Sequence, residues 1–103
     1  MHAAYWKYVV RRRLTGEKRA SFALEGSNWF ARPETATEAA LKKDIALLDE
    51  SHRALREVVA NLSEASLKPL RGGKRNRTAW VVSGIAAHDL YHAGQIQLLK
   101  KLQ

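Results

Sequence analysis

The 103-residue chain contains no cysteine. Disulfide frameworks, thiolate nucleophiles and cysteine-based zinc sites are therefore excluded, and the composition fits the reducing cytoplasm. No apolar run approaches the roughly 20 residues that cross a bilayer. The basic run Arg11–Arg13 follows the first apolar residues instead of preceding them, which is the opposite order to a secretory signal. We expect a cytoplasmic protein without a membrane partner.

Proline is scarce, and strand patterns are lacking. The two prolines, Pro33 and Pro69, interrupt no periodic segment. The only strand-like signals are short apolar pairs inside segments of helical period. There are no internal repeats, and the length gives room for one modest core. Residues 1–103 are therefore expected to form a single all-α domain.

In three segments, mostly apolar residues recur at alternating steps of four and three, a spacing that puts them on one face of a helix. The expected helices cover approximately residues 2–14, 37–62 and 78–102. The middle segment has the longest repeat, and such a seam is typical of a helix that packs nearly parallel to its neighbours. Its seam positions are Leu41, Ile45, Leu48, His52, Leu55, Val59 and Leu62. The pattern predicts a helical bundle.

Polar residues and a glycine mark the expected helix ends. Thr35 or Thr37 can cap the middle helix, and Glu38 lies three residues after Thr35, as a capping box requires. Thr78 is a plausible N-cap for the last helix. Gly16 follows the first helix as a stop signal.

The segment between the first two helices is irregular but not wholly polar. It contains the apolar anchors Phe22, Leu24, Trp29 and Phe30. We expect a long ordered connection that lies against the bundle.

The net charge of +8 arises from 18 Lys and Arg residues against 10 Asp and Glu residues. The bases gather in two clusters, Arg11–Arg13 with Lys18 and Arg19, and Arg71–Arg77 in a glycine-containing loop. Neither cluster is accompanied by a recognition motif or an aromatic stacking pattern. Solvated helix ends and loops account for such charge, so nucleic acid is not an expected partner.

All four histidines lie on the helical seams: His2 on the first, His52 on the second, and His88 and His92 on the last. A single seam histidine is more often a hydrogen-bonded core or boundary residue than a metal ligand. The pair changes this assessment, because residues four apart on a helix project from the same face. Two such imidazoles can bind one metal ion, as they do in HExxH sites.

A metal ion also explains how both rings of the pair could be satisfied. An unsatisfied buried polar group costs about 1–3 kcal/mol. The seam neighbours Ile85 and Leu99 offer no hydrogen bond, and Gln95 could serve only one ring. A third histidine would complete a site with open positions for water or substrate. His2 and His52 both compete for that place.

Two stretches resemble the DinB/YfiT-like superfamily of metal-dependent enzymes: HAAYWKYVVRRRLTG near the start and GIAAHDLYHAGQIQLLKKL near the end. The HxxxHxGQ signature in the second stretch is the most specific part. The resemblance implies an antiparallel four-helix bundle, commonly dimeric, in which three histidines hold a divalent transition metal such as zinc or nickel. It assigns the ligands to His2, His88 and His92. Gln95 matches the motif glutamine, and His52 receives no ligand role.

By this resemblance we expect the chain to start where the family's second helix starts, either because it is a fragment or because the natural protein is short. We expect another subunit to cover the apolar seam that this leaves bare, so that a homodimer or higher homo-oligomer completes the bundle. His2 lies at a helix end, where chains can fray. The metal is therefore expected to be weakly held, and the free amine of Met1 could itself coordinate.

The resemblance implies a metal-dependent hydrolase or a thiol-dependent transferase that acts on a small molecule. The sequence indicates neither the substrate nor a catalytic residue. Tyr91 and Trp6 could line a pocket, although core packing is the expected role of both. The alternative is a non-catalytic helical oligomerisation or interaction module that has lost metal-dependent activity, and metal content distinguishes the two.

Overall fold

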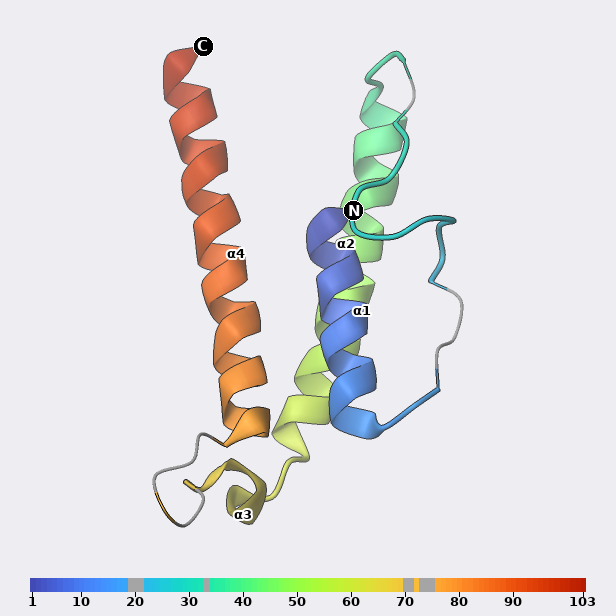
Figure 1. Cartoon of the computed structure of the whole chain (residues 1–103). Helices are drawn as coiled ribbons and strands as arrows, with labels where there is room; N and C mark the ends of the chain where they lie inside the picture. The colour runs from blue at the N-terminus through green and yellow to red at the C-terminus, as the bar shows by residue number, and fades with distance from the viewer. Residues whose placement is uncertain (19–21, 33, 70–71, 73–75) are drawn as a thin grey trace. The chain divides into compact units, whose positions relative to one another are not determined.

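A computed structural model describes residues 1–18, 22–32, 34–69, 72 and 76–103. Figure 1 shows its helices, which are α1 (His2–Thr15), α2 (Glu38–Ala60), α3 (Glu64–Leu67) and α4 (Arg77–Leu102). Among the described residues there is no strand, apart from an isolated bridge between Ser27 and Trp29. The all-α prediction is confirmed. Within the predicted basic clusters, Arg19, Arg71, Lys74 and Arg75 lie outside the described residues.

The helices belong to two compact units. The first unit, Met1–Leu62, contains α1 and α2, and the second unit, Ser63–Gln103, contains α3 and α4. The expectation of one domain over residues 1–103 stays a prediction. None of the helices in the described residues is long and apolar enough to cross a membrane.

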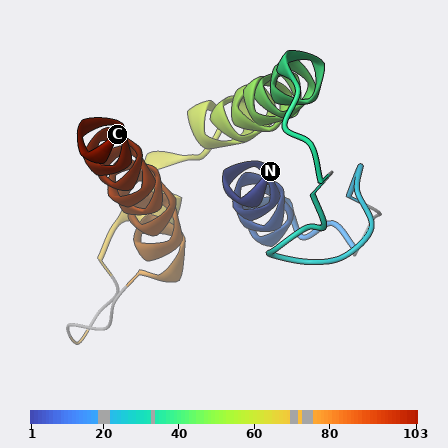
Figure 2. The same cartoon turned by 90° about the horizontal axis from the view of Figure 1, so that it is seen from above.

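In the first unit, α1 packs against α2, and both helices run in the same direction (Figures 1 and 2). The antiparallel arrangement implied for the bundle therefore does not hold for this pair. The physical reason is the long connection between Gly16 and Glu38, which returns the chain to the end where α1 begins. Bundles with such crossover connections pack by the same seam geometry as those with short loops.

An aromatic cluster holds the connection against α1. Phe22 lies 5.5 Å from Tyr5 and 5.3 Å from Tyr8 between ring centroids, and Phe30 lies 5.6 Å from Tyr5. Aromatic pairs at such separations contribute beyond the area they bury. The predicted order of this connection is confirmed for its described residues.

The connection is also tied to α2. Arg32 reaches Asp44 with both terminal nitrogens, at 2.6 and 3.2 Å from the two carboxylate oxygens. This two-pronged geometry is the stronger form of an Arg–carboxylate pair. This ion pair fixes the position of the segment that leads into α2.

The seam predicted for α2 is only partly buried. Leu55 is buried, Leu48 and Val59 are half-buried, and Leu41 and Ile45 are exposed by 56% and 49%. The regular spacing therefore predicted the helix correctly but not the extent of its contact. The reason is length, because the 23 residues of α2 extend beyond the 14 residues of α1.

Two predicted helix ends are confirmed in the first unit. Thr37 caps α2, with its Oγ1 accepting a hydrogen bond from the backbone N–H of Ala40 at 3.1 Å. The alternative cap, Thr35, lies outside the helix. Gly16 ends α1 in the left-handed conformation, with φ of 70°, as a helix stop requires.

The N-cap predicted for the last helix is wrong. Helix α4 begins at Arg77, and Asn76, not Thr78, is its N-cap. The Asn76 side-chain oxygen accepts from Ala79 N–H at 3.0 Å, while its amide donates to the carbonyls of Ser66 and Lys68 at 2.8 and 2.6 Å. One side chain thus starts α4 and holds the end of α3, a short helix that periodicity did not predict.

We expect Asn76→Ala to lower the free energy of unfolding by about 2 kcal/mol, because it removes an N-cap and two hydrogen bonds to carbonyls. Thr78→Ala is the matched control and should change stability little. Urea titration followed by far-ultraviolet circular dichroism compares the two. Equal destabilisation by both substitutions would contradict the assignment of Asn76 as the cap.

Candidate metal centre

Helix α4 brings His88 and His92 together. The ring centroids are 4.5 Å apart with an interplanar angle of 77°, and the two Nε2 atoms are 3.1 Å apart. Both side chains are half-buried. The prediction that this i, i+4 pair shares one helix face is confirmed.

Gln95 determines the tautomer of His92. Its Oε1 lies 2.7 Å from His92 Nδ1. An amide oxygen can only accept, so Nδ1 of His92 carries the proton and donates it. In the neutral ring the lone pair is then on Nε2, the atom that faces His88. The expectation that Gln95 could serve only one ring agrees with this geometry.

The spacing of the two Nε2 atoms suits a shared cation. Imidazole nitrogens bind zinc at about 2.0–2.1 Å, so two of them on one tetrahedral ion lie about 3.3 Å apart, and less when the angle between them narrows. The observed 3.1 Å agrees with that value. Imidazole suits zinc, copper, iron and nickel alike. The donor pair therefore fits a divalent transition metal.

One residue beside the histidine pair is more exposed than the sequence predicted. Tyr91 was expected to pack in the core, but its side chain is 64% exposed, although its ring lies 5.3 Å from that of His92. Helix geometry explains this, since residues next to each other in sequence project about 100° apart around the axis. Asp89 is half-buried, and so is Trp6 in the first unit.

His2 lies in the first turn of α1 and is held by the connection that follows. Its Nδ1 is 3.0 Å from the main-chain oxygen of Asn28, and its ring stacks on Trp29 with centroids 4.2 Å apart and planes 17° apart. A carbonyl oxygen only accepts, so Nδ1 of His2 carries the proton, and the lone pair of the neutral ring is on Nε2.

The roles of Asn28 and Trp29 were not found from the sequence. Trp29 was expected only as an apolar anchor, and Asn28 carried no signal beyond its place in the short stretch GSNW. An asparagine in such a stretch indicates a turn. It does not indicate which side chain the turn contacts.

The predicted ligands are divided between the two units. His2 belongs to the first unit, whereas His88 and His92 belong to the second. All three side chains are half-buried. Their convergence on one ion stays a prediction. His52, the fourth histidine, is exposed on α2, and the absence of a ligand role for it stays a prediction.

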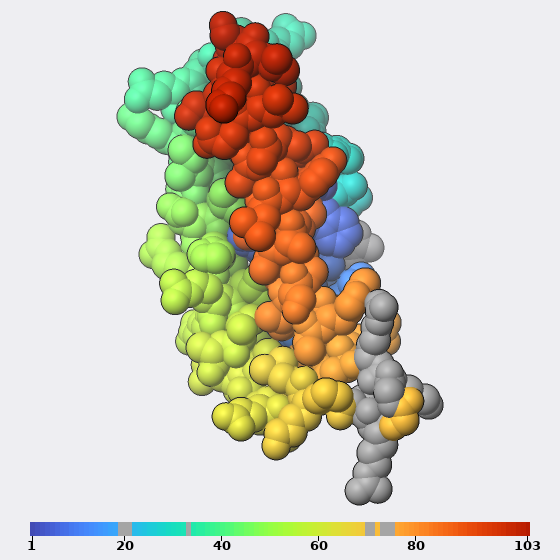
Figure 3. Space-filling view, turned by 90° about the vertical axis from the view of Figure 1, so that its left-hand side faces the viewer, coloured from blue at the N-terminus to red at the C-terminus, as the bar shows by residue number. Residues whose placement is uncertain are grey.

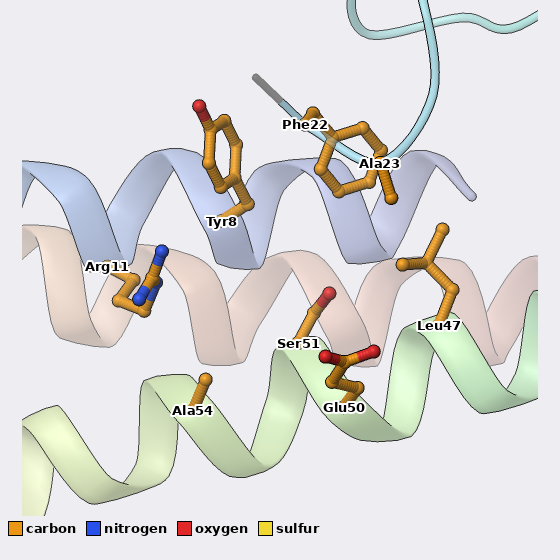
Figure 4. Close-up of a pocket in the computed structure, with 8 residues that line it drawn as sticks. All are labelled: Tyr8, Arg11, Phe22, Ala23, Leu47, Glu50, Ser51 and Ala54. Carbon is orange, nitrogen blue, oxygen red and sulfur yellow. The ribbon is translucent and has the colours of Figure 1, made fainter. Parts of the chain in front are cut away.

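The first unit also contains a pocket of about 230 Å³ between α1, α2 and the connection (Figure 4). Arg11 and Glu50 bring opposite charges to its wall, and the remaining lining residues are Tyr8, Phe22, Ala23, Leu47, Ser51 and Ala54. Arg11 is half-buried and also forms an ion pair with the exposed Glu17 at 3.4 Å. No predicted metal ligand lines this pocket, so it is not part of the candidate metal centre.

Comparison with known proteins supports the resemblance seen in the sequence. The family model of the DinB superfamily matches residues 1–96. This range includes all four histidines and the HxxxHxGQ signature. No curated protein and no solved structure matches the chain.

Replacing Gln95 by leucine should release the tautomer of His92. In the metal-free protein we expect His92 to hold its proton on Nδ1, and Gln95→Leu to yield a mixture of the two neutral tautomers. Long-range ¹H–¹⁵N correlation spectra of the imidazole rings report this directly. His52, which is exposed, gives the reference pattern within the same spectrum. An unchanged His92 pattern would show that Gln95 does not control the ring.

Proposed function

The chain belongs to the DinB superfamily, and from this premise we propose that it binds a divalent transition metal through His2, His88 and His92. The spacing of the two Nε2 atoms on α4 is the observation that supports this proposal most strongly. Zinc and nickel are the metals that the family resemblance implies, and both accept imidazole ligands.

The protonation of the rings supports the same assignment. A histidine binds a metal through a nitrogen that carries no proton. The oxygen acceptors beside Nδ1 of His2 and of His92 leave Nε2 as the donor atom on both rings. Metal-binding histidines commonly have such a partner on the other nitrogen. Both rings therefore present Nε2 as the ligand atom, and a bound ion would take the place of the contact between Nε2 of His92 and Nε2 of His88.

The proposed activity is that of a metal-dependent hydrolase or thiol-dependent transferase acting on a small molecule. A divalent ion with three imidazole ligands keeps coordination positions open, where it acts as a Lewis acid toward a water or a thiol. The residues of the chain hold the ion and orient its ligands. No catalytic acid or base is assigned.

Metal titration tests the ligand set. We expect the protein to bind about one equivalent of Ni²⁺ or Zn²⁺ in calorimetry, and the double variant His88→Ala, His92→Ala to lose this binding. His2→Ala should weaken it, because two imidazoles remain. The matched control is His52→Ala, which changes an exposed histidine outside the proposed set.

Two outcomes would remove the proposal. One is that the wild-type protein binds neither ion, and the other is that the double variant binds as tightly as His52→Ala does. If His2→Ala alone behaved like the control, the pair on α4 would remain the site and His2 would not belong to it.

The proposal includes a homodimer, for which α4 offers a surface. The side chains of Trp80, Tyr91 and Leu98 are 60%, 64% and 59% exposed, and their spacing puts them on one helix face with the small residues Gly84 and Gly94. Figure 3 shows one side of the surface of α4, coloured orange to red. Contiguous exposed apolar surface of this kind marks interaction sites. At both glycines an added Cβ would meet nothing within 4 Å, so the backbone there is open to close approach. We propose a second copy of α4 as the occupant of this face, because a self-complementary interface closes into a dimer.

Light scattering coupled to size-exclusion chromatography tests the assembly. We expect a dimer for the wild-type protein and a monomer for Leu98→Glu, which places a charge within the apolar face. Ala93→Glu is the control, since Ala93 is exposed on another side of α4. A wild-type monomer at all concentrations, or dissociation by the control alone, would contradict the proposed interface.

The same face supports the second candidate function, a non-catalytic oligomerisation module. This candidate needs the exposed apolar face of α4 but not the ligands. A stable dimer that binds no Ni²⁺ or Zn²⁺ would favour it. A dimer that binds metal through the pair on α4 favours the metal-dependent function.

A further inference from the structure

The tight turn at Ser27–Trp29 has an unusual backbone. Asn28 has φ of 62° and is the one non-glycine residue with positive φ among the described residues. Across it, the N–H of Trp29 donates to the carbonyl of Ser27 at 2.6 Å, which closes a three-residue turn. Turns of this kind with positive φ are rare and strained. Such strain persists only where the surrounding structure holds it, and it is concentrated at functional sites.

Three contacts within the first unit hold this turn to the start of α1. Trp6 Nε1–H donates to the side-chain oxygen of Asn28 at 2.7 Å. Nδ1–H of His2 donates to the main-chain oxygen of the same residue at 3.0 Å. The Trp29 ring, although 72% exposed, stacks on the His2 ring.

The first turn of α1, which contains His2, has no side-chain cap. The N-cap of α1 is Met1, which makes no side-chain capping hydrogen bond. A helix end without a cap frays, and a side chain in its first turn moves with it. The contacts with the turn at Asn28 therefore add order to a helix end that has no side-chain cap.

We propose that Asn28, anchored by Trp6, is a positioning residue that holds His2 in its Nδ1–H tautomer and so presents Nε2 as a metal ligand. The inference rests on the proposed metal-binding function but concerns residues that the family signature does not include. Asn28 touches neither the metal nor a substrate in this scheme. It acts through its main-chain oxygen, and its side chain serves to keep that oxygen in place.

The stacked ring of Trp29 also restrains the His2 ring. A hydrogen bond to Nδ1 fixes the tautomer but leaves the ring able to rotate about that contact. Stacking of the two rings with planes 17° apart limits this rotation. Together the two contacts define both which nitrogen binds and where its lone pair points.

The experiment removes the hydrogen bond between Trp6 and Asn28 in two ways, by changing its acceptor and by changing its donor. Asn28→Gly tolerates positive φ and keeps the main-chain oxygen, but lacks the acceptor for Trp6. Trp6→Phe keeps an aromatic ring and removes the donor. Each should weaken Ni²⁺ binding about tenfold or more, the usual effect of losing a partner behind a ligand. The double variant should be no weaker than either single variant, because all three lack the same bond.

Asn28→Asp is the rescue, since aspartate also tolerates positive φ and restores an acceptor for Trp6. Asn61→Gly is the matched control. The Asn61 amide donates to the carbonyl of Glu57 at the end of α2, so its loss affects a helix end without touching His2. Both variants should bind Ni²⁺ within about twofold of the wild-type protein.

Ring spectra of the metal-free protein give a readout that does not depend on the metal. His2 should show the Nδ1–H tautomer in the wild-type protein and in Asn28→Asp, and a mixture in Asn28→Gly. If Asn28→Gly keeps both the wild-type tautomer and the wild-type affinity, the positioning role is wrong while metal binding stands. If the wild-type protein binds no Ni²⁺ but the His2 tautomer still depends on Asn28, the positioning role of Asn28 is supported and the proposed metal-binding function is wrong.

Discussion

A neutral imidazole has one proton and two nitrogens, and the position of that proton decides which nitrogen can bind a metal. In this protein the position is set by oxygen acceptors beside Nδ1: the main-chain oxygen of Asn28 for His2, and the side chain of Gln95 for His92. Both leave Nε2 as the donor atom. The rest of the candidate site follows from this constraint, because residues that place these oxygens also select the ligand atom.

The two acceptors are supplied in different ways. Gln95 lies three residues after His92 on the same helix, so the formation of α4 alone brings the two side chains within reach of each other. Asn28 is separated from His2 by 26 positions, and the contact requires the connection to fold back on α1. The aromatic cluster around Tyr5 and Phe22 makes this possible, because it fixes the connection against the helix. These aromatic contacts in the first unit therefore orient His2, the proposed ligand, as well as stabilise the fold.

Helix α4 has more apolar surface than one contact requires. One face contains the histidine pair together with Ile85, which is buried, and another displays Trp80, Tyr91 and Leu98 to solvent. A helix that is apolar around most of its circumference is normally covered on several sides. The face with His88 and His92 and the proposed dimer face are adjacent on the same helix. A dimer would thus limit the motion of the element that presents His88 and His92.

Periodicity alone determined the all-helical fold, the approximate extent of α1, α2 and α4, and the pairing of His88 with His92, because these depend on contacts three and four residues apart. Only the tertiary structure decided that α1 and α2 run in the same direction, that Asn76 and not Thr78 starts α4, and that Asn28 holds His2. These features depend on where a connecting segment lies. Local spacing does not encode that position, because a loop can place its polar groups against any surface that satisfies their hydrogen bonds.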